Sequence, residues 1–149
     1  MPFLTIQVSA AGPVIDAYIG VSQARAEVLQ GTGIPVPKLY PVRALVDTGA
    51  SRTCVDPSIL HHLNLTPTGT MKVHTPTTGT QPVDVDQYEV GFLIPHFNPA
   101  PAGFARASVA VAESELFAAQ GIHALIGMDI LSGCLVILDG VVGQLTLAY

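Results

Sequence analysis

Short apolar runs separated by turn-forming residues recur along the whole chain. The runs are rich in β-branched and aliphatic residues, and Gly, Pro, Asn and Asp stand between them. Spacing of this kind is typical of an all-β sandwich or barrel. We therefore expect strands at residues 3–8, 14–21, 42–46, 71–74, 83–93, 107–112, 134–138 and 145–149.

Helices are expected to be few and short, because twelve prolines and fourteen glycines oppose long ones. Asp56 followed by Pro57 predicts a helix that begins at Pro57, with Asp56 as its N-cap, and runs to about Leu63. A second helix is predicted over residues 113–120, and a third, of one or two turns, over residues 128–132.

Two segments are predicted to be loops. Residues 22–38 begin with a mildly helical, Ala-rich stretch and continue as Gly- and Pro-rich sequence, so we expect an excursion between two strands. Residues 75–80 are a polar turn between two short strands, which predicts the tip of a hairpin. Two interpretations of this hairpin stay open: a flap over a substrate cleft, or an ordinary surface hairpin.

The composition limits the classes of partner. Apolar residues make up 49% of the 149 residues and charged residues only 11%, which fits a chain that buries an apolar face against a partner. A net charge of -5 with six scattered Lys and Arg argues against nucleic acid and against anionic membranes. The start of the chain lacks the features of a signal peptide, and no run is long enough to span a bilayer. We expect a cytoplasmic protein with one domain over residues 1–149.

Cysteine and histidine residues show no spacing typical of a metal or redox site. Cys54 and Cys134 match no metal-ligand pattern, and we expect both to be reduced thiols. The five histidines are scattered, apart from the adjacent His61 and His62, whose side chains would point to different faces of a short helix. We therefore expect neither a metal nor a cofactor.

The strongest chemical signal in the chain is the tripeptide Asp47-Thr48-Gly49. It follows the apolar run at residues 41–46 and precedes Ala50. Hydrolysis of an amide without a metal or a covalent nucleophile requires two carboxylates that share one proton. One draws a proton from water while the other polarises the carbonyl. The sequence contains no second Asp-Thr-Gly and no Asp-Ser-Gly. The partner carboxylate must then come from a second copy of the chain, in a symmetric homodimer.

This interpretation is strengthened by a second motif, Ala124-Leu125-Ile126-Gly127-Met128-Asp129-Ile130-Leu131. Together with residues 44–51 it resembles the retropepsin-like aspartic proteases, which include the retroviral proteases and cellular relatives. The resemblance implies a closed β-barrel with a flap hairpin and one to three short helices. It also implies that Ile126 and Gly127 pass beneath the catalytic loop and support it before the chain turns into a short helix.

The resemblance assigns roles to individual residues. Asp47 is the catalytic carboxylate, the Thr48 hydroxyl bonds to the backbone of the opposite loop, and Gly49 permits a tight turn. Many pepsin-like relatives have a hydroxyl at the position of Ala50 that stabilises the ionised aspartate, so we expect a weakly acidic working pH. The expected peptide-binding residues follow the catalytic motif or lie on the flap: Ala50, Ser51, His74, Thr75, Pro76, Thr77, Thr78 and Gly79.

The chain departs from the retroviral pattern at two positions. Retroviral enzymes brace the site with an ion pair between an Arg and an Asp, and the corresponding residues here are Met128 and Ser51. Asp129, next along the chain, is interpreted as a helix-start residue.

Two functions fit these observations. One is an endopeptidase that binds an extended polypeptide across a dimer cleft. The other is a catalytically silent module that keeps the fold for dimerisation or peptide binding. Retention of Asp47, Thr48 and Gly49 together favours catalysis, because a scaffold would accept Asn or Ala at position 47. We also expect the last strand, at residues 144–149, to pair with its copy in a second subunit and so join the dimer.

Overall fold

The computed structural model describes residues 1–75, 78–96, 103–116 and 118–149. The helices of this part of the chain are α1 (Gln23–Gly31), α2 (Pro57–His62) and α3 (Met128–Leu131), with a 3₁₀ turn at Ala118–Gln120. The remaining elements are strands, so the predicted all-β class is confirmed. They are β1 (Phe3–Gln7), β2 (Val14–Val21), β3 (Tyr40–Val46), β4 (Cys54–Val55), β5 (Gly69–Val73), β6 (Val83–Ile94), β7 (Phe104–Glu113), β8 (Ala124–Ile126), β9 (Leu135–Asp139) and β10 (Gln144–Ala148).

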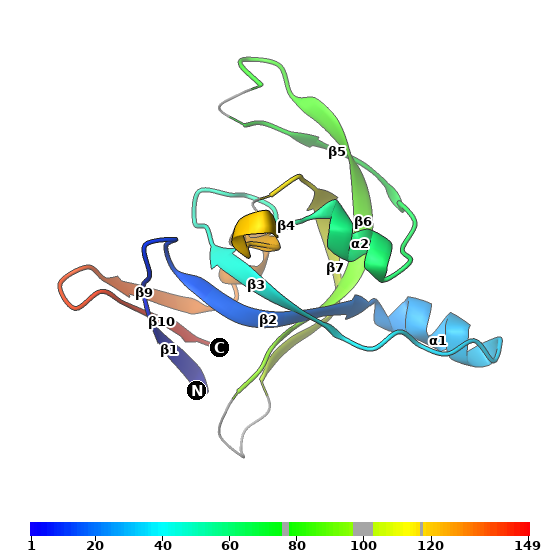
Figure 1. Ribbon diagram of the computed structural model, residues 1–149, viewed down its shortest axis with the longest axis horizontal. Coiled ribbons are helices and arrows are strands. Elements are labelled where there is room, and N and C mark those ends of the chain that lie inside the picture. The colour runs from blue at the N-terminus through cyan, green and yellow to red at the C-terminus, as the bar shows by residue number, and fades with distance from the viewer. Residues whose placement is uncertain (76–77, 97–102, 117) are drawn as a thin grey trace.

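Six of the strands form a closed barrel (Figure 1). Their order is β2, β3, β8, β4, β7 and β6, and the last part of β6 pairs back onto β2. A register shift between Val90 and Phe92 places an irregularity at Gly91. A Cβ at this glycine would lie 2.9 Å from the carbonyl oxygen of Val21, so only Gly allows β6 to approach β2 this closely.

Alternate residues of the strands fill the barrel, because successive side chains of a strand point to opposite faces. Two neighbouring strands show the pattern, with buried Ile15, Ala17 and Ile19 on β2 and buried Val42, Ala44 and Val46 on β3. Leu60 of α2 and Ile130 of α3 belong to the same buried cluster. The two short helices are therefore anchored on the barrel, next to the strands that they follow.

The hairpin predicted around residues 75–80 is confirmed. β5 pairs antiparallel with the first part of β6, from Gly69 opposite Gln87 to Val73 opposite Val83. In Figure 1 this hairpin rises above the barrel at the top of the view. It has the position relative to the barrel that a flap requires.

The strands at the two ends of the chain form a separate three-stranded sheet in the order β1, β10, β9. β10 is the middle strand, so both of its edges are paired within one chain. The prediction that the last strand pairs with its copy in a second subunit is therefore wrong. The reason is that the N-terminal strand pairs with it, which places the two ends of the chain close together (Figure 1).

The helix predictions had mixed outcomes. α2, with Asp56 as N-cap, and α3 are confirmed. The helix predicted over residues 113–120 is met only by the 3₁₀ turn at Ala118–Gln120. Its start is wrong, because Ala112 and Ser114 donate backbone hydrogen bonds to the segment around β4 and so extend β7 to Glu113. α1 lies in the predicted excursion and was not expected as a full helix. Its N-cap is Ser22, but Leu29 is the only residue it buries, so its apolar periodicity is weak.

Candidate active site

Asp47 lies directly after β3, at the start of the loop that connects β3 to β4. Its backbone N–H donates to the carbonyl oxygen of Ile126 at 3.0 Å, which ties the start of the loop to β8. The loop then turns sharply, because the N–H of Ala50 donates to the carbonyl oxygen of Asp47 at 3.2 Å. Gly49 donates its N–H to Asp47 Oδ1 at 2.9 Å. A charged carboxylate that accepts a backbone hydrogen bond keeps a defined orientation.

The residues that follow Asp47 face solvent. Asp47 is half-buried, while Thr48, Gly49 and Ser51 are exposed. The Thr48 hydroxyl makes no hydrogen bond within the described part of the chain. A Cβ added at Gly49 would lie 3.2 Å from Asp47 Oδ1, a tight approach that glycine avoids.

β8 runs beneath this loop, as the resemblance to retropepsin-like enzymes implies. It pairs parallel with β3 and antiparallel with β4, so it lies between the strands that enter and leave the loop. Gly127 follows β8 and packs directly on the backbone of Arg52, since a Cβ at position 127 would lie 2.5 Å from the carbonyl carbon of Arg52. Ile126 and Gly127 are thus brought to the underside of the Asp47 loop.

A hydrogen-bond cluster that the sequence interpretation missed connects the end of the loop to α3. Thr53, which is fully buried, donates its hydroxyl to Asp129 Oδ1 at 2.7 Å and its N–H to both carboxylate oxygens at 3.0 Å. Asp129 lies in the first turn of α3 and also accepts from the N–H of Ile130, but most of its bonds go to Thr53. Met128 and Ser51 are exposed. The departure from the retroviral pattern at these two positions was the signal that another brace was needed.

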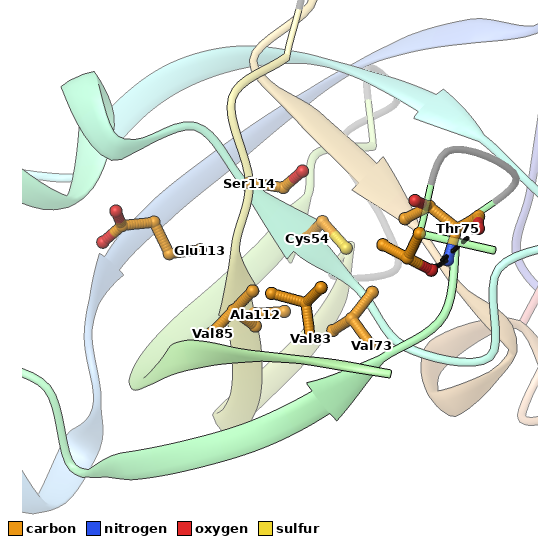
Figure 2. A pocket seen from close by; sticks show the side chains of 9 residues that line it. Cys54, Val73, Thr75, Val83, Val85, Ala112, Glu113 and Ser114 are labelled. Carbon is orange, nitrogen blue, oxygen red and sulfur yellow. Dashed lines mark hydrogen bonds between the residues drawn. The ribbon is translucent and has the colours of Figure 1, made fainter. Parts of the chain in front are cut away.

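A pocket of about 130 Å³ lies between the flap and the barrel (Figure 2). Its walls are mostly apolar, with lining residues Cys54, Val73, Thr75, Thr78, Val83, Val85, Ala112, Glu113 and Ser114. In Figure 2 the Cys54 sulfur faces Val73 and Val83, and the carboxylate of Glu113 points away from it. That carboxylate accepts a hydrogen bond from the Tyr88 hydroxyl at 2.8 Å.

The flap residues predicted to bind peptide are only partly brought to this pocket. Thr75 and Thr78 line it, and the N–H of Thr75 donates to Thr78 Oγ1 at 3.0 Å. His74 and Gly79 are exposed on the flap and do not line the pocket, and neither do Asp47, Ala50 and Ser51. Pro76 and Thr77 lie outside the described residues.

The apolar lining of the pocket was also missed. Cys54 and the valines of the hairpin are aliphatic or small residues in short runs, which sequence alone does not separate from barrel core. Only the pairing of β5 with β6 and of β4 with β7 brings them to one place.

The electrostatics of Cys54 connect the pocket with the Asp47 loop. Burial raises the pKa of the Cys54 thiol, and the negative charges of Asp129 and Asp47 raise it further. The thiol therefore stays protonated and keeps the base of the pocket uncharged. Tyr88 is affected similarly, because burial and its bond to Glu113 raise its pKa to about 12.

The cysteines and the other possible metal ligands are distributed as follows. Both cysteines are free thiols, Cys54 buried and Cys134 half-buried. Among the described residues, no group of three or more His, Cys, Asp or Glu gathers as a metal site would require. The helices of the described ranges are all too short to span a bilayer.

Comparisons with known proteins agree with this geometry. The aspartyl protease family matches residues 33–130 of the chain. No curated protein sequence matches this chain. Among solved structures, the crystal structure of a retropepsin-like aspartic protease from Rickettsia conorii is similar, with a TM-score of 0.56 and 16% identity over 99% of this chain and 91% of that chain. At this identity the likeness shows a shared fold. The chain therefore belongs to the aspartyl protease family and has a retropepsin-like fold.

Proposed function

We propose that the protein is an aspartic endopeptidase that acts as a homodimer, in which each subunit supplies one Asp47 and residues 1–149 act as one domain. The observation that carries this proposal is a half-complete site. Asp47 stands on a solvent-facing loop held by backbone hydrogen bonds, and the sequence has one such motif. The other nearby carboxylate, Asp129, is bonded to Thr53 and so is not free to share a proton with Asp47.

The catalytic step follows from two carboxylates brought together by the two-fold axis. Two carboxylates at close range cannot both ionise, so Asp47 and Asp47 of the partner subunit would share one proton. The ionised member takes a proton from water, and the protonated member donates a hydrogen bond to the scissile carbonyl. Water then adds to the carbonyl carbon as the protonated carboxyl gives its proton to the carbonyl oxygen, which forms a tetrahedral diol. The carboxyl that took the water proton gives it to the nitrogen as the C–N bond breaks, and the diol returns a proton to the other carboxylate, so the shared proton is restored. Thr48 has an exposed hydroxyl that could bond to the partner's loop.

The pocket beneath the flap supports a peptide substrate. Its volume of about 130 Å³ is close to that of an apolar cavity of about 150 Å³ that holds a benzene-sized group. One aliphatic or small aromatic side chain would fill it. The flap tip, with Thr75 and Thr78, would lie over an extended peptide that places this side chain against Cys54.

A surface for the second copy is present on the terminal sheet. Phe3 of β1 and Leu135 and Ile137 of β9 lie on the same outer face, because they are in register with Ala148 and Thr146 of β10. These three apolar side chains are 50% to 58% exposed. In Figure 1 the β9–β10 hairpin and the loop after β3 lie on the same, left side of the view. We assign this face to a second copy of the chain, because Asp47 needs a partner carboxylate.

The direct test is the variant Asp47→Asn, assayed with a library of unstructured peptides at weakly acidic pH. We expect it to lose proteolysis while sedimenting as the wild type does. Asp84→Asn is the matched control, because this carboxylate is exposed on the flap and, within the described residues, forms an ion pair with Lys72 alone, so the activity of the variant should stay at the wild-type level. Cleavage by Asp47→Asn at the wild-type rate would refute the assignment.

A further inference from the structure

The segment at residues 126–129 contacts the Asp47 loop at its start, middle and end. The carbonyl oxygen of Ile126 accepts from the N–H of Asp47 at 3.0 Å. The N–H of Met128 donates to the carbonyl oxygen of Ala50 at 2.8 Å. Both of these bonds join backbone atoms, so they do not depend on side-chain identity. They fix the first half of the loop only.

The second half of the loop is held through two side chains, Thr53 and Asp129. The N–H of Gly127 donates to Thr53 Oγ1 at 3.1 Å, and that hydroxyl donates in turn to Asp129 Oδ1 at 2.7 Å. The N–H of Thr53 donates to the same carboxylate, and its carbonyl oxygen accepts from Ala112 at 3.0 Å. Every polar group of this fully buried threonine therefore has a partner. A network satisfied in this way holds one geometry, whereas a partly satisfied one does not.

We propose that Asp129 is a positioning residue for Asp47 and acts through Thr53, which it holds at the far end of the catalytic loop. The inference rests on the proposed proteolytic function. β3 fixes the loop at Asp47 and the Asp129 carboxylate fixes it at Thr53, so the turn between them has both ends tied. If the second end is released, Asp47 no longer has a fixed position relative to the partner subunit, and a displacement of about 1 Å can lower a rate about 100-fold.

Asp129 also contributes to the position of the pocket. Cys54 follows Thr53 directly and begins β4, so the carboxylate that holds Thr53 also holds the base of the pocket. Together with the pairing of β4 with β7 and β8, this side chain connects the peptide-binding pocket with the catalytic loop. No other side chain among the described residues hydrogen-bonds to the Thr53 hydroxyl or N–H.

The experiment compares kcat and KM for Asp129→Ala, Thr53→Val and Thr53→Ser at a temperature well below unfolding. We expect kcat to fall about 100-fold in the first two variants, with a smaller change in KM. Thr53→Ser keeps the hydroxyl and should retain most of the activity. Thr53→Val keeps the volume and loses both hydroxyl bonds, so it gives the same comparison if Asp129→Ala fails to fold.

The matched control is Asp56→Ala. Asp56, like Asp129, is a hydrogen-bonded carboxylate next to a short helix, and it accepts from the Ser58 N–H, the Ser58 hydroxyl and the Leu116 N–H. It makes no bond to residues 47–53 in the described structure. We expect this variant to lose stability as Asp129→Ala does and to keep the wild-type kcat. Equal kcat in Asp129→Ala and Asp56→Ala would overturn the inference.

Amide hydrogen exchange separates failure of this inference from failure of the proposed function. Exchange at residues 47–50 should be faster in Asp129→Ala than in Asp56→Ala, and this can be measured without turnover. If the wild-type protein cleaves no peptide, the proposed function fails, while faster exchange would still support the tie between Asp129 and the loop. Equal exchange in the two variants would reject that tie.

Discussion

The close contact between Gly127 and the loop beneath Asp47 makes Gly127→Ala an informative perturbation. An added Cβ would lie 2.5 Å from the carbonyl carbon of Arg52, 2.6 Å from its oxygen and 2.9 Å from the nitrogen of Thr53. All three atoms belong to backbone, so no side chain can rotate away. Carbon atoms in contact normally stay about 3.5 to 4.0 Å apart, so the two segments must separate by about 1 Å.

The expected cost has two parts. Overpacking of this kind typically destabilises a protein by about 1–3 kcal/mol. The shift also pulls Gly127 away from Thr53, whose hydroxyl accepts its N–H at 3.1 Å. We expect a loss of about 2–4 kcal/mol in the free energy of unfolding, because a buried hydrogen bond contributes about 1 kcal/mol more. A displacement of about 1 Å under the catalytic loop should also lower kcat about 100-fold.

Urea unfolding and peptide cleavage together measure these effects. Gly31→Ala is the control, since a Cβ at this helical glycine meets no atom within 4 Å and should leave stability and activity unchanged or slightly improved. If Gly127→Ala were as stable and as active as Gly31→Ala, the close contact would not matter, and the account of how the loop is supported would be wrong.

Three other predictions test separate parts of the account. Ile137→Arg should weaken the dimer at least about 100-fold, because it places two like charges in an apolar interface at a cost of about 3 kcal/mol. Val28→Arg, at an exposed position on α1, is the control and should leave the dimer unchanged. Sedimentation velocity distinguishes the two, and an Ile137→Arg variant that stays dimeric would exclude the outer face of the terminal sheet as the interface. Although burial alone would raise the pKa of Asp56, its hydrogen bonds leave that pKa below the ordinary value. The carboxylate therefore stabilises the fold above about pH 4, and this stabilisation is lost as pH falls through the lowered pKa. Thermal unfolding of Asp56→Asn should show a weaker acid dependence than the wild type, and equal dependence would contradict this. Burial raises the pKa of both thiols, but Cys54 is buried and Cys134 only half-buried, so Cys54 should react with iodoacetamide more slowly. Mass spectrometry of the labelled peptides measures this, and faster labelling of Cys54 would contradict the pocket geometry.

Much of the barrel could be predicted from the sequence because most of its strands are long enough to show alternation. The strand at Val14–Val21 was predicted with its observed bounds, and β6 differs by one residue at its end. β4 and β8 were not predicted as strands, since two or three residues carry no periodicity. β8 was recognised only as part of a motif. α1 was missed for a related reason, because a helix that buries one residue has almost no apolar stripe.

The catalytic motif could be read from sequence, but its surroundings could not. Asp47 is identified by its neighbours along the chain, whereas Thr53 and Asp129 are 76 positions apart and meet only through β8 and β4. The last strand illustrates the same limit. Its apolar pattern is visible, but its pairing partner is a matter of topology, and β1 occupies the edge that was expected to be free.

The central claim is that one active site needs two chains, and mixing wild-type protein with Asp47→Asn tests it most directly. A fixed amount of wild type is equilibrated with increasing amounts of the variant, and peptide cleavage is measured. With equal amounts, random pairing leaves about half of the wild-type chains in wild-type dimers, so activity should fall to about half and decline further with excess variant. Activity that stays constant throughout the titration would show that each chain acts alone, and would contradict the account.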